Sequence, residues 1–261
     1  MRQTLTTLLA ALALLALVLP AARAGDEEAV QKEADVKAQY AAAALLQKQV
    51  TGQKGEERRA AQQRAAAAFE AVARYFPEEQ ATAGLALYQA AEIHEVLRDR
   101  DKAVGCLNRV FQMQAEDLVK ARAHNLLGHI YRRARSFADA IKEYEAVLGA
   151  GPKAETEAAE AMGWIGKCKA QLGDQQGARE VWKARAERFP KRHALVVESY
   201  DWIACSLHRE GKVEEARRTL EACRARLAAA AADTGPAGHR VRKALGNMRI
   251  LKLLESGETK S

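Results

Sequence analysis

The sequence predicts an all-helical solenoid, in which antiparallel helix pairs stack in a row and a C-terminal helix caps the stack. Three observations indicate this fold. The hydrophobic residues make up 48% of the chain and are mainly alanine and leucine, which favour closely packed helices. Only 5 of the 261 residues are prolines, so long windows remain open to helix. Small and bulky residues recur every 37 to 38 positions, and such a fixed period is typical of a solenoid.

The chain begins with the pattern of an export signal. Arg2 gives a positive start, residues 8–19 form an apolar core, and residues 22–24 have the A-x-A form of a cleavage site. We therefore expect cleavage of residues 1–24 after Ala24 and a periplasmic location in a bacterial cell envelope. An uncleaved inner-membrane anchor is the alternative, but the apolar run is short for a spanning helix and Pro20 interrupts it.

The strongest signal is an internal repeat in the middle of the chain. Each copy has a small residue in its first helix, a second small residue twelve positions later, a bulky residue four positions further and a closing proline. These positions are Gly128, Ala140, Tyr144 and Pro152 in one copy and Gly166, Ala178, Trp182 and Pro190 in the next. Antiparallel helices approach closely only where both carry small side chains, and the bulky residue then fills the adjacent gap.

The same frame extends to both ends of the chain and predicts five helix pairs. The small residue of the second helix recurs at Ala65, Ala103, Ala140, Ala178 and Ala216. The expected pairs cover about 28–76, 82–115, 119–150, 156–190 and 195–228. A coiled-coil arm is the alternative for residues 28–50, although they lack leucine heptads.

The C-terminal part predicts a cap. Residues 233–236 read Asp-Thr-Gly-Pro and break the helical pattern. Residues 238–254 then predict one amphipathic capping helix that covers the last apolar face of the stack. Residues 255–261 are expected to be a frayed tail.

The repeat resembles the tetratricopeptide repeat and its W-L-G-Y, A, F, A, P spacing. The segment at residues 69–96 is similar to bacterial envelope repeat proteins, notably the outer-membrane assembly lipoprotein and the periplasmic factor of the Tol-Pal system. This resemblance implies a right-handed α-solenoid that binds a protein or peptide partner.

The resemblance also implies a binding face, because the first helix of each tetratricopeptide pair lines a concave groove. The residues that it assigns to a peptide-binding groove are Tyr88, Glu92, Asn125, His129, Arg132, Arg133, Trp164, Lys167, Trp202 and His208. The middle of this groove is basic and contains tryptophans, so it would hold an extended peptide that is acidic or ends in a carboxylate. The alternative is that the tryptophans are core residues and the arginines a solvated face.

Positive charge is in modest excess, with 41 lysines and arginines against 34 acidic residues. A second basic surface is expected at the C-terminal end, from Arg217, Arg218, Arg224, Arg226, Arg240, Arg242, Lys243 and Arg249. It could make a peripheral contact with an anionic membrane surface or an acidic partner, and a solvated helix cap is the alternative. We expect no nucleic-acid partner, because the chain is predicted to be exported.

No motif predicts catalysis, a cofactor or a metal. The sequence lacks G-x-S-x-G, a Walker lysine motif, H-E-x-x-H and any Cys/His spacing typical of zinc. Four cysteines in an exported protein suggest a disulfide, for which Cys205 and Cys223 are the better pair. The alternative is four small buried thiols.

These expectations combine into an exported scaffold or adaptor for protein–protein interaction in the cell envelope, with no enzymatic activity. Two alternatives remain open. The solenoid could bind a peptide or glycan substrate for envelope enzymes, or it could be a self-assembling structural protein.

Overall fold

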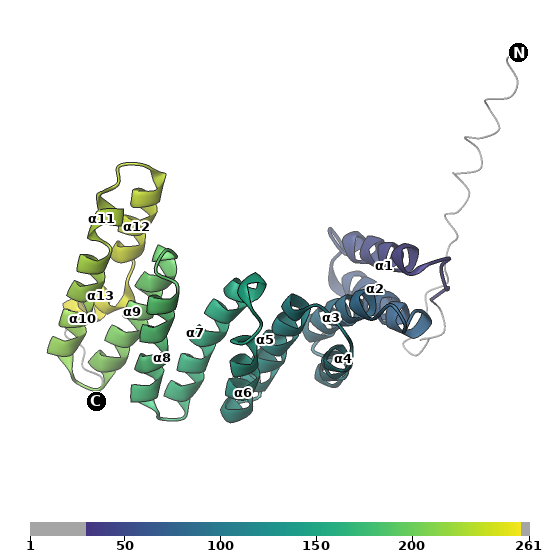
Figure 1. Cartoon of the computed structure of the whole chain (residues 1–261), viewed down its shortest axis with the longest axis horizontal. Helices are drawn as coiled ribbons and strands as arrows, with labels where there is room; N and C mark the ends of the chain where they lie inside the picture. The colour runs from purple at the N-terminus through teal and green to yellow at the C-terminus, as the bar shows by residue number, and fades with distance from the viewer. Residues whose placement is uncertain (1–29, 257–261) are drawn as a thin grey trace, which may run out of the picture.

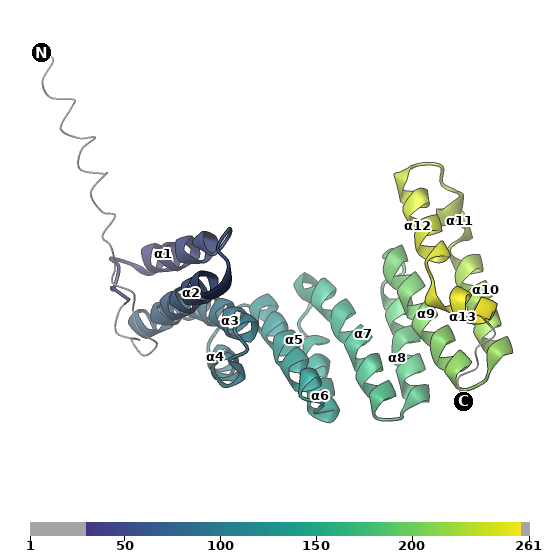
Figure 2. The same cartoon turned by 180° about the vertical axis from the view of Figure 1, so that it is seen from behind.

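The computed structural model describes residues 30–256 of the chain, and within this range every regular element is a helix. The helices up to residue 226 stack side by side in chain order into an elongated body, as Figures 1 and 2 show from opposite sides. This confirms the predicted all-helical solenoid. The expected signal at residues 1–24 lies outside the described residues, as does most of the expected tail. No helix between residues 30 and 256 has the length and apolar character to cross a lipid bilayer.

Five helix pairs form the stack. They are α1 (Val36–Gln49) with α2 (Gly55–Tyr75), α3 (Gln80–Val96) with α4 (Arg100–Gln112), α5 (Asp117–Arg133) with α6 (Phe137–Val147), α7 (Glu155–Gln171) with α8 (Gln175–Arg188), and α9 (His193–Arg209) with α10 (Val213–Arg226). A 3-10 turn, η2 (Pro152–Ala154), precedes α7. The chain then continues through α11 (Ala228–Ala232), α12 (Pro236–Gly246) and α13 (Arg249–Ser256).

Small residues allow the close contact between the two helices of a pair, as the repeat predicts. The alanines at the five repeat positions (Ala65, Ala103, Ala140, Ala178 and Ala216) are all 0% exposed. A Cβ atom on Gly128 would lie 2.6 Å from the ring of Tyr144, and one on Gly166 would lie 2.1 Å from Nε1 of Trp182. Both glycines therefore make room for the bulky residue of the partner helix.

The reversal inside four of the pairs uses the same turn. The residue after the cap of the first helix has a positive φ, at Arg98 (64°), Arg135 (63°), Gly173 (89°) and Gly211 (76°). In each case the next N–H bonds a carbonyl five residues earlier, for example Asp174 to Lys169 at 3.0 Å. This is the Schellman motif, which ends a helix and favours glycine. Glycine occupies this position at two of the four turns, and Arg98 and Arg135 adopt the positive φ at the other two.

Two helix boundaries differ from the sequence-based expectation. The helix expected from residue 28 begins at Val36, because the Asp35 carboxylate accepts a hydrogen bond from the N–H of Ala38 at 2.8 Å and caps its N-terminus. The single capping helix expected over 238–254 is two helices, α12 and α13. The break follows a Gly-Asn dipeptide at the end of α12, and a carboxylate on α9 fixes the start of α13.

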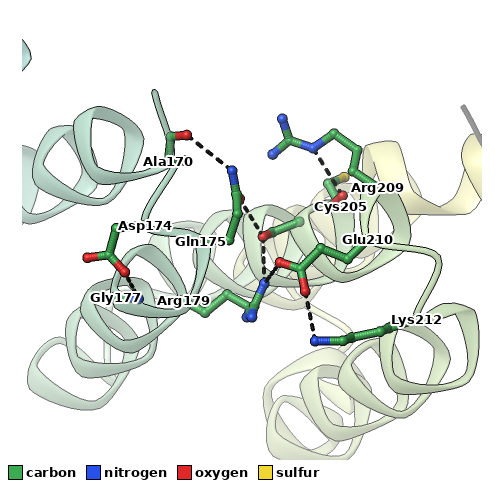
Figure 3. Close-up of polar contacts among 10 residues, drawn as sticks. Ala170, Asp174, Gln175, Gly177, Arg179, Cys205, Arg209, Glu210 and Lys212 are labelled. Carbon is green, nitrogen blue, oxygen red and sulfur yellow. Dashed lines mark hydrogen bonds and ion pairs between the residues drawn. The ribbon is translucent and has the colours of Figure 1, made fainter. Parts of the chain in front are cut away.

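A polar network joins the fourth pair to the fifth (Figure 3). Arg179 on α8 donates to the hydroxyl of Ser206 at 3.0 Å and forms an ion pair with Glu210. The Ser206 hydroxyl donates to Gln175 at 3.0 Å, and Lys212 lies 2.8 Å from Glu210. The hydrogen bonds from Arg179 and Lys212 lower the pKa of the Glu210 carboxyl. These contacts fix α8 against α9 at the ends of both helices.

The four cysteines are buried free thiols. Cys205 and Cys223, the better disulfide pair by sequence, are not bonded to each other in this structure. The structure thus agrees with the alternative, in which the cysteines are small residues at helix contacts.

Candidate binding groove

A groove of about 900 Å³ crosses the first helices of three successive pairs, α5, α7 and α9. Its basic lining residues are Arg132, Arg133, Arg135, Lys167, Arg209, Arg249 and Lys252. Its larger apolar lining residues are Phe137, Trp164, Trp182, Trp202 and Leu253. No aspartate or glutamate occurs among the described residues that line it. The groove is therefore strongly basic and partly aromatic.

Lys167 lies at the centre of this groove between two tryptophans. Its Nζ atom is 4.1 Å from the ring centroid of Trp164 and 4.1 Å from that of Trp202. The guanidinium of Arg132 lies 4.1 Å from the Trp164 centroid. Such distances allow cation–π attraction, which holds the two cations and the rings in one arrangement. Burial lowers the pKa of Lys167, neighbouring arginines lower it further, and Glu198 opposes them.

Most of the positive charge in the groove has no carboxylate partner. Of the seven cations, Arg133 lies 2.5 Å from Glu95 and Arg249 lies 3.1 Å from Asp201. The other five form no ion pair with a residue between 30 and 256, and the buried Nε of Arg132 also has no hydrogen-bond partner there. Unneutralised cations that line one concavity attract anionic groups.

Arg185 supports the groove from behind. It is a buried residue of α8 that donates to the carbonyl of Ala159 at 2.7 Å and to the hydroxyl of Ser199 at 3.1 Å. Its guanidinium also lies 2.9 Å from Glu198 and 5.0 Å from the ring centroid of Trp202. The side chain thus joins α7, α8 and α9 and helps to hold the Trp202 ring. A smaller pocket of about 310 Å³ lies beside it.

The structure brings together half of the residues that the sequence assigned to the binding face. Arg132, Arg133, Trp164, Lys167 and Trp202 all line the groove. Trp202 is only 9% exposed. The tryptophans are therefore both core residues and groove residues, which were the two alternatives in the sequence analysis. They pack against neighbouring helices, and part of each ring still faces the groove.

The other half of the assigned residues lie elsewhere. Tyr88 donates to Glu92 at 2.9 Å, and Glu92 lines a separate pocket of about 510 Å³ beside the α1–α2 turn. Burial raises the pKa of both side chains. Asn125 is buried and donates to the carbonyl of Glu157 at 3.1 Å, so it links α5 to α7.

Neither of the two assigned histidines lines the groove. His129 lies 2.6 Å from the hydroxyl of Tyr144 and 3.3 Å from Glu160, and its ring packs edge-on against Trp164. The hydrogen bond from His129 lowers the pKa of the Glu160 carboxyl. His208 is 4% exposed and faces the core. A residue of a first helix need not line the groove, because the side chains of one helix point to several faces, and one of these faces packs against the second helix.

The groove residues assigned from the sequence did not include those of the α5–α6 turn or of α13. Arg135 and Phe137 come from the α5–α6 reversal, and Lys252 comes from α13. Arg249 belonged to the predicted C-terminal surface, whereas the structure places it in the groove. No local signal in the sequence could show that α13 folds back against α9.

Two arginines of the predicted C-terminal basic surface also make structural hydrogen bonds. Arg242 donates to the carbonyls of Ala231 and Asp233 at 2.5 and 2.7 Å, and Arg226 donates to that of Ala186 at 3.3 Å. Arg242 thus holds the α11–α12 connection, and Arg226 ties α10 to α8, while both side chains remain exposed. Contact of the C-terminal basic residues with an anionic membrane stays a prediction.

The fold and the groove define the class of this protein. It is an α-solenoid whose first helices present a concave surface, and repeat proteins of this kind use such surfaces for binding. Residues 121–153, which include most of α5 and all of α6, match the tetratricopeptide repeat. The chain therefore contains a tetratricopeptide repeat.

Solved structures show the same fold over most of the chain. The crystal structure of MamA is 15% identical, with a TM-score of 0.51, and the match covers 67% of this chain and 93% of that one. A candidate kinesin light chain from Podosopora anserina with nearly identical tetratricopeptide-like repeats is 15% identical, with a TM-score of 0.56 and coverage of 77% and 100%. BtubC from P. vanneervenii is 17% identical, with a TM-score of 0.53 and coverage of 81% and 89%. No curated protein matched the sequence.

Proposed function

We propose that this protein is a non-catalytic scaffold whose basic groove binds an extended, acidic segment of a partner protein. The observation that carries the proposal is the set of five groove cations that have no carboxylate partner within residues 30–256. Three of them, Arg132, Lys167 and Arg209, lie on first helices, the face that tetratricopeptide repeats offer to their ligands. Arg135 and Lys252 come from the α5–α6 turn and from α13.

The chemistry of the lining suits an acidic peptide in two ways. Arginine guanidinium groups bind carboxylates through paired hydrogen bonds, and a hydrogen bond to a charged group contributes about 1.5–3 kcal/mol. Tryptophan rings supply apolar area for the side chains between the carboxylates, and tryptophan and arginine are frequent among the residues that dominate binding energy. The groove offers both kinds of residue within one concavity.

A charge-reversal experiment tests this function. The probe is a fluorescein-labelled ten-residue peptide of glutamate and aspartate with one central leucine, and its binding is followed by fluorescence anisotropy. We expect Arg132→Glu with Lys167→Glu to weaken binding at least about tenfold, which corresponds to 1.4 kcal/mol. A lysine peptide of equal length should not bind. The matched control is Lys183→Glu, on the exposed face of α8 outside the groove, which should leave the affinity unchanged.

Two outcomes would contradict the proposal. One is equal affinity of the groove variant and the wild type for the acidic peptide. The other is an equal loss in the Lys183→Glu control, which would mean that overall charge, and not the groove, attracts the peptide. Concentration-dependent sedimentation of the free protein would instead favour the self-assembling alternative.

We further propose that the scaffold acts in a bacterial cell envelope after export. The support is the sequence pattern of residues 1–24 alone. The intact mass of the mature protein tests it, with Gly25 expected as the first residue. A mature protein that still begins at Met1 would exclude cleavage.

A further inference from the structure

Three metal-ligating side chains that do not line the groove converge in the two N-terminal helix pairs. Glu70 on α2, His94 on α3 and Cys106 on α4 place their ligand atoms within 4.8 Å of one another. Nε2 of His94 lies 2.7 Å from Oε1 of Glu70. His94 and Cys106 are 5% and 4% exposed, and the Glu70 side chain is 19% exposed. The cluster is thus closed on the sides of His94 and Cys106 and open to solvent through Glu70.

We propose that Glu70, His94 and Cys106 form a binding site for a divalent transition-metal ion of the zinc type. Zinc binds thiolate, imidazole and carboxylate ligands, whereas magnesium and calcium prefer oxygen ligands alone. A thiolate and a carboxylate together balance the charge of a divalent cation. Three protein ligands leave one position of a tetrahedral ion for water or for a donor from another molecule.

The spacing of the donors is close to what coordination requires. Zinc–ligand bonds of about 2.0–2.3 Å separate the ligand atoms of a tetrahedral site by about 3.3–3.8 Å. The observed separations run from 2.7 Å, between His94 and Glu70, to at most 4.8 Å. Binding would open the Glu70–His94 contact and bring the most widely spaced donors closer by at most about 1–1.5 Å, a movement that side-chain torsions can supply.

The chemistry of the binding step balances without any further reactant. The thiol of Cys106 loses its proton to solvent as the sulfur–metal bond forms, and His94 and Glu70 each donate a lone pair to the ion. No redox change occurs, because zinc keeps its 2+ charge.

The two ring nitrogens of the buried His94 side chain have different surroundings. Hydrogen bonding within residues 30–256 satisfies Nε2 of His94, but Nδ1 is buried and has no partner there. Nε2 is the nitrogen that faces Glu70, so it is the atom that would bind the ion, and metal binding would replace its hydrogen bond to the carboxylate.

The site would also have a structural consequence. Glu70 belongs to the first helix pair, and His94 and Cys106 belong to the second. An ion bound by all three would cross-link two neighbouring pairs of the solenoid. The ligands are 24 and 12 residues apart in sequence, so no short metal motif could reveal them.

Cobalt(II) is a suitable probe, because it enters zinc sites and reports thiolate ligation by absorption. The reduced full chain is freed of metal with a chelator and titrated with Co²⁺. We expect a thiolate-to-cobalt charge-transfer band that saturates at about one equivalent and disappears on addition of Zn²⁺. Cys106→Ala should abolish this band. Glu70→Gln should weaken Co²⁺ binding at least about tenfold. The matched control is Cys168→Ala, a buried thiol outside the cluster, which should keep the band.

The proposal is overturned if the wild type shows no charge-transfer band. It is also overturned if the band survives in Cys106→Ala or vanishes in a folded Cys168→Ala. Circular dichroism checks that each variant is folded. Should Cys106→Ala not fold, Glu70→Gln and His94→Gln decide the matter, and wild-type affinity for Co²⁺ in both would overturn the site.

Discussion

The carboxylate of Asp201 on α9 accepts a hydrogen bond from the backbone N–H of Ile250 at 3.0 Å, across 49 residues of chain. Its second oxygen accepts from Nε of Arg249 at 3.1 Å. Because Ile250 lies in the first turn of α13, the carboxylate caps that helix and holds it against α9. The contribution of α13 to the binding groove thus depends on one buried acidic residue.

Replacement of this residue should loosen the last helix. Asp201→Ala leaves the Ile250 N–H without its acceptor and Arg249 without its carboxylate, so we expect a loss of about 1–3 kcal/mol in the free energy of unfolding. Amide hydrogen exchange should accelerate most in α13. Urea denaturation and hydrogen exchange measure the two effects. The control is Asp139→Ala, at an exposed ion pair with Lys142, which should change stability by less than about 0.5 kcal/mol. Equal denaturation midpoints for both variants would contradict the capping role.

The glycine at the helix contact of the fourth pair should not tolerate a methyl group. In Gly166→Ala the new Cβ would meet the Trp182 ring, so we expect destabilisation by about 1–3 kcal/mol. Gly105→Ala is the contrasting variant, because nothing lies within 4 Å of its Cβ and it is inside helix α4. There the higher helix propensity of alanine should stabilise the protein by about 0.5–1 kcal/mol. Thermal denaturation would disprove the packing argument if both variants shifted in the same direction.

Binding of the acidic peptide should weaken at alkaline pH. The pKa of Lys167 is lowered by burial, so this lysine loses its charge at a lower pH than an exposed lysine. Aspartate and glutamate in the peptide stay ionised throughout that range. Affinity should therefore fall as pH rises through the Lys167 pKa. Lys167→Arg, which keeps its charge, should remove this fall. The same alkaline loss in wild type and Lys167→Arg would show that another group is responsible.

The four thiols should resist alkylation in the folded protein. Burial raises the pKa of Cys168 and Cys223 to about 11 and that of Cys106 and Cys205 to about 12, so little thiolate forms at pH 8. Iodoacetamide should modify all four after unfolding in urea without a reductant, as counted by mass spectrometry. Modification of only two, at Cys106 and Cys168, would instead establish a disulfide between Cys205 and Cys223.

The sequence was informative where a structural feature depends on residues close together in the chain. Gly166 and Trp182 are 16 positions apart, inside one repeat, and their packing follows from the spacing alone. The centre of the groove was also predictable, because Trp164 and Lys167 lie on one first helix and Trp202 lies at the corresponding level of the next. The repeat period therefore carries most of the fold.

Features that join distant segments could not be predicted in the same way. The break between α12 and α13 depends on Asp201. The amphipathic pattern of residues 238–254, taken alone, predicts one continuous helix. The place of Lys252 in the groove follows from that break. Likewise, the meeting of Glu70, His94 and Cys106 requires the relative rotation of three helices, which no periodicity specifies.

The contacts of Arg179 and Arg185 have a consequence for the thermodynamics of binding. Arg179 ties α8 to the end of α9 through Ser206, and Arg185 ties α8 to both α7 and α9. The rings and cations of the groove centre are thereby held in position by residues that lie behind the groove. A ligand therefore meets a preorganised surface, and the entropy lost on association falls mainly on the ligand and little on the protein.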